Sequence, residues 1–186
     1  MPDFVSAPKP ALAHAPLCAS DGSFVLEPLP QGRLIQALAS PSADAHDVVA
    51  RLSDVAGTGL FAVRPYAPGQ WFVIGDAPLV PGEAAQLEQA VGTDVALSDQ
   101  SHGRTRLALE GTRARDVLAC GCALDLADAA FPVGRSAQTL FGHVGVHVTR
   151  TEPERFELVV LRSFAADLWE ELAQAGAAFL PGTAAS

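Results

Sequence analysis

A pattern of an apolar strand followed by an amphipathic helix occurs three times in this chain, over residues 71–91, 105–119 and 156–175. Each strand is a short apolar run, and each helix has apolar residues three or four positions apart. Predicted strands outnumber predicted helices and often come in adjacent pairs, as at about 137–141 and 143–150. We therefore predict an α+β fold with a mixed, largely antiparallel sheet and its helices on one face.

Small residues mark where each helix is expected to begin and end. The expected boundaries are Pro81 and Gly92, Gly111 and Gly121, and Ser163 and Gly176. We expect Ser163 to cap the last helix, whose apolar face would be formed by Phe164, Leu168, Trp169 and Leu172. Trp71 also falls in an apolar run and is expected in the core.

The first fifty residues differ from the rest, because they contain seven prolines and little periodicity. We predict that residues 1–50 form an extended Pro-rich arm with one short element, either free or ordered against a partner. Residues 51–180 are then predicted to form a single globular α+β domain of two similar halves, about 51–100 and 101–180.

Composition limits the classes of partner. Hydrophobic residues make up 49% of the chain, so it can bury a core, and 21 acidic against 12 basic residues give a formal net charge of −9. This balance argues against nucleic acid or an anionic membrane as a partner. We see no secretory signal and no apolar stretch long enough to cross a bilayer. Three unevenly placed cysteines do not suggest disulfides, so a cytoplasmic location is expected.

The candidate metal ligands are Cys120 and Cys122 with His143 and His147. Zinc knuckles usually place two residues between their cysteines, and here only Gly121 separates them. Four residues along a strand span roughly 13 Å, too far for both histidines to reach one ion. We therefore predict no metal site.

The polar stretch from Ser98 to Arg104 contains the residue types of a hydrolytic triad. Real triads draw these residues from separate loops, and no G-x-S-x-G motif is present. We expect Asp99 and Ser101 to hydrogen-bond backbone groups in a turn between strands. The sequence also lacks G-x-G-x-x-G and Walker A motifs, so we assign no catalytic and no cofactor-binding residue. Four arginines form either a solvated face or a patch for acidic groups of a partner: Arg104, Arg106, Arg113 and Arg115.

Several stretches, in order and with continuous spacing over about 99–172, resemble the sarcosine oxidase gamma-subunit family. They include DQSHGR at 99–104, LALEG at 107–111, GCALDL at 121–126, FPVG at 131–134, AQT at 137–139, FELVV at 156–160 and RSFA at 162–165. The match before residue 99 is weaker, and the first fifty residues match little.

This resemblance implies a fold of two ferredoxin-like halves, similar to folate-binding aminomethyltransferase-type domains. It implies a non-catalytic gamma subunit of a heterotetrameric, flavin-dependent complex that oxidatively demethylates sarcosine or a related secondary amine. The implied partners are the alpha, beta and delta subunits, mainly the large alpha subunit, and the implied role is assembly and stabilisation of the large subunits. FAD, FMN, NAD and tetrahydrofolate would then lie on the large subunits and zinc on the smallest, with no cofactor in this chain.

Other functions stay open. The related fold suggests a stand-alone folate-binding one-carbon protein, in which Asp99 would be the candidate acid or base. The complex could equally be a related N-methyl amino acid or imino acid dehydrogenase. A metal-binding regulator using Cys120, Cys122 and a histidine is a third alternative.

Overall fold

The computed structural model describes residues 10–56 and 61–179, which form two antiparallel sheets. The larger sheet has six strands, in the order β1 (Leu17–Cys18), β2 (Val25–Pro28), β7 (Arg104–Glu110), β10 (Arg155–Leu161), β9 (Val144–Glu152) and β8 (Ser136–Phe141). The smaller sheet has four, in the order β4 (Ala62–Ala67), β5 (Gln70–Gly75), β3 (Arg33–Ala39) and β6 (Val95–Asp99). The predicted α+β class with largely antiparallel sheets is confirmed.

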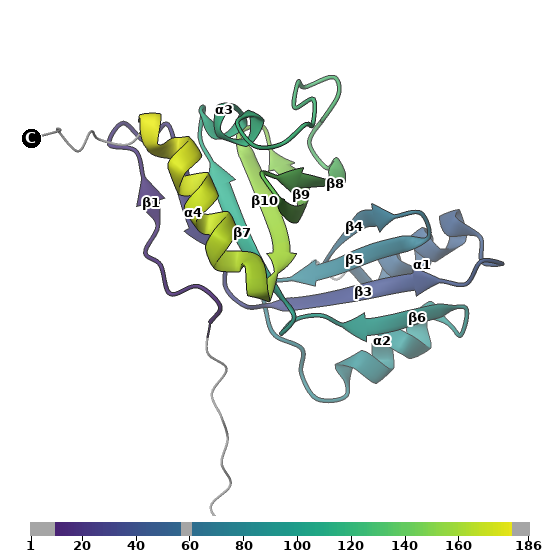
Figure 1. Ribbon diagram of the computed structural model, residues 1–186. Coiled ribbons are helices and arrows are strands. Elements are labelled where there is room, and N and C mark those ends of the chain that lie inside the picture. The colour runs from purple at the N-terminus through teal and green to yellow at the C-terminus, as the bar shows by residue number, and fades with distance from the viewer. Residues whose placement is uncertain (1–9, 57–60, 180–186) are drawn as a thin grey trace, which may run out of the picture.

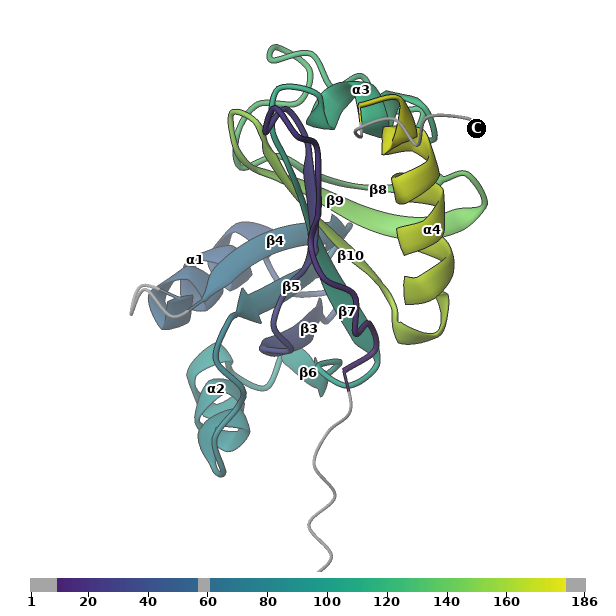
Figure 2. The same ribbon diagram turned by 90° about the vertical axis from the view of Figure 1, so that its left-hand side faces the viewer.

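Each sheet carries its helices on one face (Figure 1). Helices α3 (Ala114–Ala119) and α4 (Ala165–Gly176) cover the six-stranded sheet, and α1 (Ala45–Ala56) and α2 (Glu83–Val91) cover the four-stranded sheet. Short 3₁₀ turns, η1 (Arg162–Phe164) and η2 (Ala177–Phe179), flank α4. Figure 2 shows α4 on one side of the six-stranded sheet and the four-stranded sheet on the other.

The core of the larger half lies between its sheet and α3 and α4. Alternate residues of β10 point into it, and Phe156, Leu158 and Val160 are each completely buried. Leu168 and Leu172, one helical turn apart in α4, pack against the same cluster. Trp169 belongs to this core and Trp71 to the smaller one, which confirms both predictions.

The core of the smaller half is made mostly of shorter aliphatic side chains. Val48 and Leu52 from α1 and Leu87 and Val91 from α2 pack on the helix-facing residues of β3 and β5. The predicted end of this second helix at Gly92 is confirmed, because Gly92 has a φ of 85° and donates its backbone N–H to Glu88 O.

The two halves meet face to face through a third apolar cluster. Leu34, Phe72 and Ile74 of the four-stranded sheet pack on Val159, which points away from the helices of the larger half. The chain crosses between the halves at residues 28–33 and 99–104. At the first crossing, a Cβ on Gly32 would lie 2.0 Å from Gly75 O, so a side chain there would need a backbone shift.

The structure differs from the expected extended arm over residues 1–50 in the part that it describes. Strand β2 pairs with β7, β3 is a central strand of the four-stranded sheet, and α1 begins at Ala45. Residues 1–9 of the predicted arm lie outside the described residues. The expected boundary between halves also shifts, because β3 and α1 belong to the smaller half and β1 and β2 to the larger. The prolines Pro28 and Pro30 fall at the end of β2 and in the crossing, where a strand bond is not required.

The start of the last helix was also predicted incorrectly. Ser163 lies in the 3₁₀ turn η1 and does not cap α4, which begins at Ala165 after Phe164 without a side-chain capping bond. Phe164 is 44% exposed and is therefore not part of the buried helix face. The cause is the extra 3₁₀ turn, which moves the first α-helical residue from the expected Phe164 to Ala165.

Candidate functional site

The densest group of buried polar side chains lies where the two sheets meet. Glu157 of β10, with a side chain 7% exposed, accepts bonds from Arg64 Nη2 and Arg106 Nε, each at 2.5 Å. Arg106 also contacts Asp76 at 2.8 Å. Arg64 comes from β4 and Asp76 from the end of β5, so these ion pairs connect both halves of the molecule.

Alternation along the strands explains this arrangement. Glu157 is flanked in sequence by Phe156 and Leu158, which point into the helix-covered core. Glu157 therefore points to the opposite face, where Arg106 of the neighbouring strand β7 also lies. We call Arg64, Asp76, Arg106 and Glu157 the junction cluster.

The junction cluster holds its carboxylate in the charged form. Burial disfavours the charge on Glu157, but the hydrogen bonds and charges of Arg64 and Arg106 outweigh it, and the pKa of the carboxyl lies below its ordinary value. Both carboxylate oxygens are occupied by guanidinium groups. A general base needs free access to a substrate proton, so this geometry suits a structural clamp and not acid–base chemistry.

His147 of β9 lies beside the junction cluster and is almost completely buried. Its Nε2–H donates to the carbonyl of Pro65 over 2.8 Å, and its ring meets Phe72 edge-on at 5.2 Å. Burial, together with the nearby charges of Arg64 and Arg104, lowers the pKa of the imidazole from 6.5 to about 4. His147 is therefore neutral at pH 7 and joins the two sheets by a hydrogen bond.

The four arginines that the sequence set together do not form one patch. Arg106 is buried in the junction cluster. Arg113 and Arg115, at the start of α3, pair with Asp116 and Asp128 respectively. The Arg104 guanidinium stacks over the rings of Phe72 and Tyr66, at 4.9 and 5.5 Å from their centres. The predicted solvated or partner-binding patch is therefore divided among three sites.

The space near the junction cluster is small. A cavity of about 40 Å³ lies beside the two crossings, lined in part by Gln31, Ser101, Arg104 and Arg106. A pocket for a cofactor or a drug-sized molecule typically has roughly 300–1,000 Å³. An open groove of about 420 Å³ lies away from the junction cluster. Its lining is acidic on balance, because Glu110, Glu152 and Glu154 outnumber Arg155, which already pairs with Glu110, so it would repel an anionic ligand.

The turn between the halves has the structure predicted from its sequence. Asp99 accepts the backbone N–H of Ser101 at 2.9 Å, and Ser101 Oγ accepts the backbone N–H of Leu34 at 3.0 Å. His102 Nδ1 lies 2.9 Å from Gln31 Nε2, a side chain of the other crossing. The Ser101 hydroxyl also donates to Asp99 over 2.5 Å, whereas His102 bonds to Gln31 and not to Ser101. No histidine therefore lies between the serine and the carboxylate, as a triad requires.

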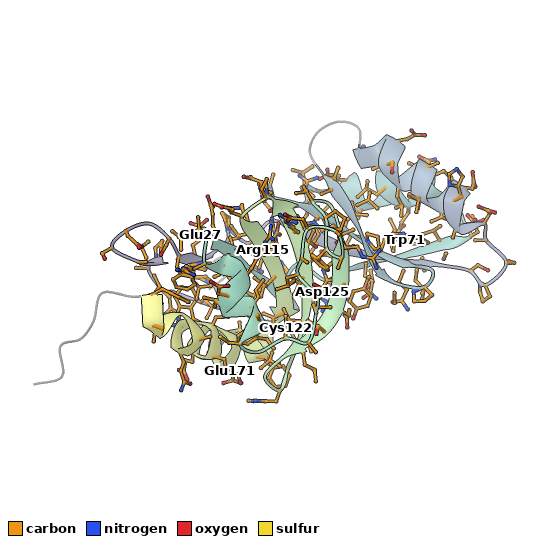
Figure 3. The ribbon with its side chains drawn as sticks, turned by 90° about the horizontal axis from the view of Figure 1, so that it is seen from above. Glu27, Trp71, Arg115, Cys122, Asp125 and Glu171 are labelled. Carbon is orange, nitrogen blue, oxygen red and sulfur yellow. The ribbon has the colours of Figure 1, made fainter. Side chains whose placement is uncertain are left out.

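The cysteines and histidines do not converge either. His147 lies at the junction, whereas His143 lies in the β8–β9 turn, 3.0 Å from Glu171 of α4. Figure 3 places Cys122 and Glu171 in the larger half and Trp71 in the smaller half. Burial raises the pKa of the Cys122 thiol, which disfavours the thiolate that a metal needs. Within residues 10–56 and 61–179, no three potential metal ligands form a group.

The junction cluster was not predicted from the sequence. Arg64 and Glu157 are 93 residues apart, and no local pattern connects them. One signal was available, because Glu157 is a lone carboxylate in the otherwise apolar run from Phe156 to Val160. A charge on the second face of such a strand indicates a buried partner.

As to membranes, none of the helices in the described part of the chain is long and apolar enough to span one.

Comparison with protein families gives a match to the sarcosine oxidase, gamma subunit family over residues 36–178. The chain belongs to this family. No curated protein sequence matches the chain. The matched region contains the whole four-stranded sheet except the start of β3, and all of the larger half after β2.

Three solved structures resemble the gamma-subunit-family fold described here. A heterotetrameric sarcosine oxidase from Corynebacterium sp. U-96, in complex with pyrrole 2-carboxylate, has a chain with a TM-score of 0.75 and 23% identity, covering 91% of each chain. The glycine cleavage system aminomethyltransferase T from Bartonella henselae gives a TM-score of 0.56 at 19% identity. It covers 84% of this chain, but this chain spans only 46% of that one. A putative C-terminal regulatory domain of aspartate kinase from Porphyromonas gingivalis W83 gives 0.50 at 9% identity, covering 82% and 96%.

Proposed function

We propose that this chain is the gamma subunit of a heterotetrameric sarcosine oxidase-type complex and that it serves assembly without catalysing a reaction itself. The observation that carries the proposal is the family match over residues 36–178. The similarity to a chain of a heterotetrameric sarcosine oxidase extends over 91% of both chains, so no large part of either fold lacks a counterpart.

The junction cluster supports a role in assembly. The buried carboxylate of Glu157 is held by two arginines of the same chain, and the cavity beside the cluster has about 40 Å³, room for very few water molecules. The ion pairs therefore stabilise one fixed arrangement of the two halves. A rigid surface loses little conformational entropy when a partner docks on it.

The proposal places the chemistry on other chains. FAD, FMN, NAD and tetrahydrofolate are proposed on the large alpha and beta subunits and zinc on the small delta subunit, with the alpha subunit as the main partner. The amine is sarcosine or a related secondary amine, including an N-methyl amino acid or an imino acid. A cytoplasmic location fits the three cysteines, each of which is a free thiol.

Co-expression of this chain with its partner subunits tests the proposal. The large alpha subunit would carry an affinity tag, and the complex would be purified with and without the chain. We expect stoichiometric co-purification, and a lower yield of assembled, flavin-containing complex when the chain is omitted. If the remaining subunits assemble and oxidise amine equally well without it, the proposal is wrong.

A stand-alone folate-binding protein is the second candidate, on the basis of the fold shared with the aminomethyltransferase. Tetrahydrofolate carries a glutamate tail and needs a large pocket with basic groups. The small size of the cavity beside the junction cluster and the acidic lining of the larger groove disfavour it. Calorimetry with tetrahydrofolate separates the two functions.

A further inference from the structure

One end of the six-stranded sheet carries a row of residues on the face that the four-stranded sheet only partly covers. Arg104 of β7 pairs with Leu161 of β10, and Gly145 of β9 pairs with Leu140 of β8. Val160 pairs with Val146, so the register sets Leu161 beside Gly145, one residue further along. Arg104, Leu161, Gly145 and Leu140 thus lie side by side, and we call them the end row.

The end row is apolar and open to solvent. Leu161 is 44% exposed and Leu140 56% exposed. Gly145 between them has no side chain, and a Cβ placed on it would meet no atom within 4 Å. Adjacent strands are about 4.8 Å apart, so the two leucines flank a shallow notch roughly 10 Å wide. Phe164, just after Leu161 in the chain, is also 44% exposed.

Arg104 gives the end row its one charge. Its guanidinium lies over the rings of Phe72 and Tyr66, and no carboxylate of the described residues pairs with it. Its Nε is buried without a hydrogen-bond partner. The other arginines of this segment, by contrast, are all paired with Asp or Glu. An arginine already held in place, beside exposed apolar side chains, is typical of the centre of a protein interface.

The charge distribution decides which kind of partner fits. The exposed positions of the helices are acidic, with Asp47 on α1, Glu88 on α2 and Asp167 and Glu170 on α4. The end row has no acidic residue, although the whole chain has a net charge of −9. Two copies of such a chain repel each other, whereas a segment with one carboxylate and an apolar side chain complements this row.

We propose that the end row is a docking surface for a partner subunit, which places an apolar side chain over Gly145 and a carboxylate against Arg104. This inference rests on the proposed function and adds to it the surface and the chemistry of the contact. Because the rings of Phe72 and Tyr66 already hold the Arg104 guanidinium, binding a carboxylate would cost it little further side-chain freedom.

The test uses the complex purified through a tag on the large subunit, with the chain present as wild type or as a variant. Leu140→Glu adds a charge to the row, Gly145→Gln fills the notch, and Arg104→Met removes the charge but keeps a long stem on the rings. Val133→Glu is the matched control, because Val133 is 51% exposed and lies in the loop before β8. Retention of the chain is measured against dilution, and circular dichroism checks that each variant is folded.

We expect Leu140→Glu and Arg104→Met to weaken retention at least about tenfold, Gly145→Gln by several fold, and Val133→Glu by less than about twofold. If the wild-type chain is retained and all four variants are retained equally, the end row is not the docking surface, while the proposed function stands. If the variants change only self-association of the chain, the occupant is a second copy and the inference is wrong. If the wild-type chain is not retained at all, the proposed function itself fails.

Discussion

The two faces of β10 are both buried, but by opposite means. On one face Phe156, Leu158 and Val160 pack against the helices, with no charged residue in that cluster. On the other, Glu157 is held by two arginines, next to Val159. The first face is stabilised by apolar area, which depends little on orientation or pH. The stability of the second face depends on hydrogen bonds of fixed geometry. It therefore depends on how the two halves are placed relative to each other.

This difference suggests a division of roles. Apolar packing holds each half together, and the junction cluster selects one arrangement of the halves among several that apolar contact alone would allow. Buried ion pairs contribute little net stability, but breaking one is costly. This property fits the proposed role in assembly, because a fixed arrangement of the halves would keep the proposed docking surface in one geometry.

The largest effect is expected from Glu157→Gln. The amide cannot neutralise Arg64 and Arg106, so their buried positive charges lose their common partner, at a cost of about 3–5 kcal/mol in the free energy of unfolding. Urea unfolding followed by circular dichroism measures it. The matched control is Glu110→Gln, at a carboxylate 47% exposed that pairs with Arg155, where we expect less than about 1 kcal/mol. Equal costs for the two variants would mean that the two faces of β10 do not differ as argued.

The next effect is a loss of stability in acid caused by His147. The folded pKa of about 4 lies below the ordinary 6.5, so between these values the unfolded chain binds a proton that the folded chain does not. The contribution of neutral His147 to the free energy of unfolding is therefore fully present above pH 6.5. It is lost as the pH falls to about 4, and the total loss is roughly 3 kcal/mol. Urea unfolding at pH 7, 5.5 and 4.5 tests this.

The His147→Gln variant should lose less stability between pH 7 and 4.5 than the wild type, since the amide does not titrate. Two controls belong with it. The first is the wild-type chain measured in parallel at each pH. Leu158→Ala, on the apolar face, should lower stability at every pH without changing the slope. A wild-type slope in His147→Gln would contradict the assignment.

A smaller effect is expected at the crossing between the halves. Gly32→Ala places a Cβ 2.0 Å from Gly75 O, and the backbone shift should cost about 1–3 kcal/mol. Gly145→Ala is the matched control, because nothing lies within 4 Å of its Cβ and its φ is not positive, so we expect a change of less than about 0.5 kcal/mol. Thermal unfolding of both variants measures the difference. A tolerated Gly32→Ala would show that the halves can shift and that the junction is not rigid.

The elements predicted best from the sequence are those marked by residues close together along the chain. Helix α2 ends at Gly92 and the β8–β9 hairpin lies near its expected bounds, because glycine and alternating valines mark them. The prediction failed for β3, whose pairing partners β5 and β6 lie more than thirty residues later. Prolines 28 and 30 and the lack of periodicity made this region resemble an arm. Most of β3 is buried on both faces, and Arg33 and Gln36 interrupt its apolar residues, so its sequence shows no alternation to detect.

The candidate site was harder to predict than the fold. The clustered arginines at 104–115 suggested one solvated face or one patch. Arg104 and Arg106 share a face of β7 but contact different partners, and Arg113 and Arg115 lie at the start of α3. Arg106 finds Glu157 only through the pairing of β7 with β10. Contacts of this kind depend on the tertiary register, so composition and spacing along the chain could not reveal them.

The smallest expected effect is in the titration with tetrahydrofolate, where we expect no binding. Because the junction is filled by ion pairs and apolar side chains, we expect the purified chain to give no saturable heat with tetrahydrofolate at millimolar concentration. A folate-binding enzyme titrated from the same stock provides the positive control. The 40 Å³ cavity cannot hold a pterin ring, and Arg106 is already paired with Glu157 and Asp76. One-to-one binding in the micromolar range would instead mean that the two halves open. The charged face of β10 would then be a ligand site and not a structural clamp.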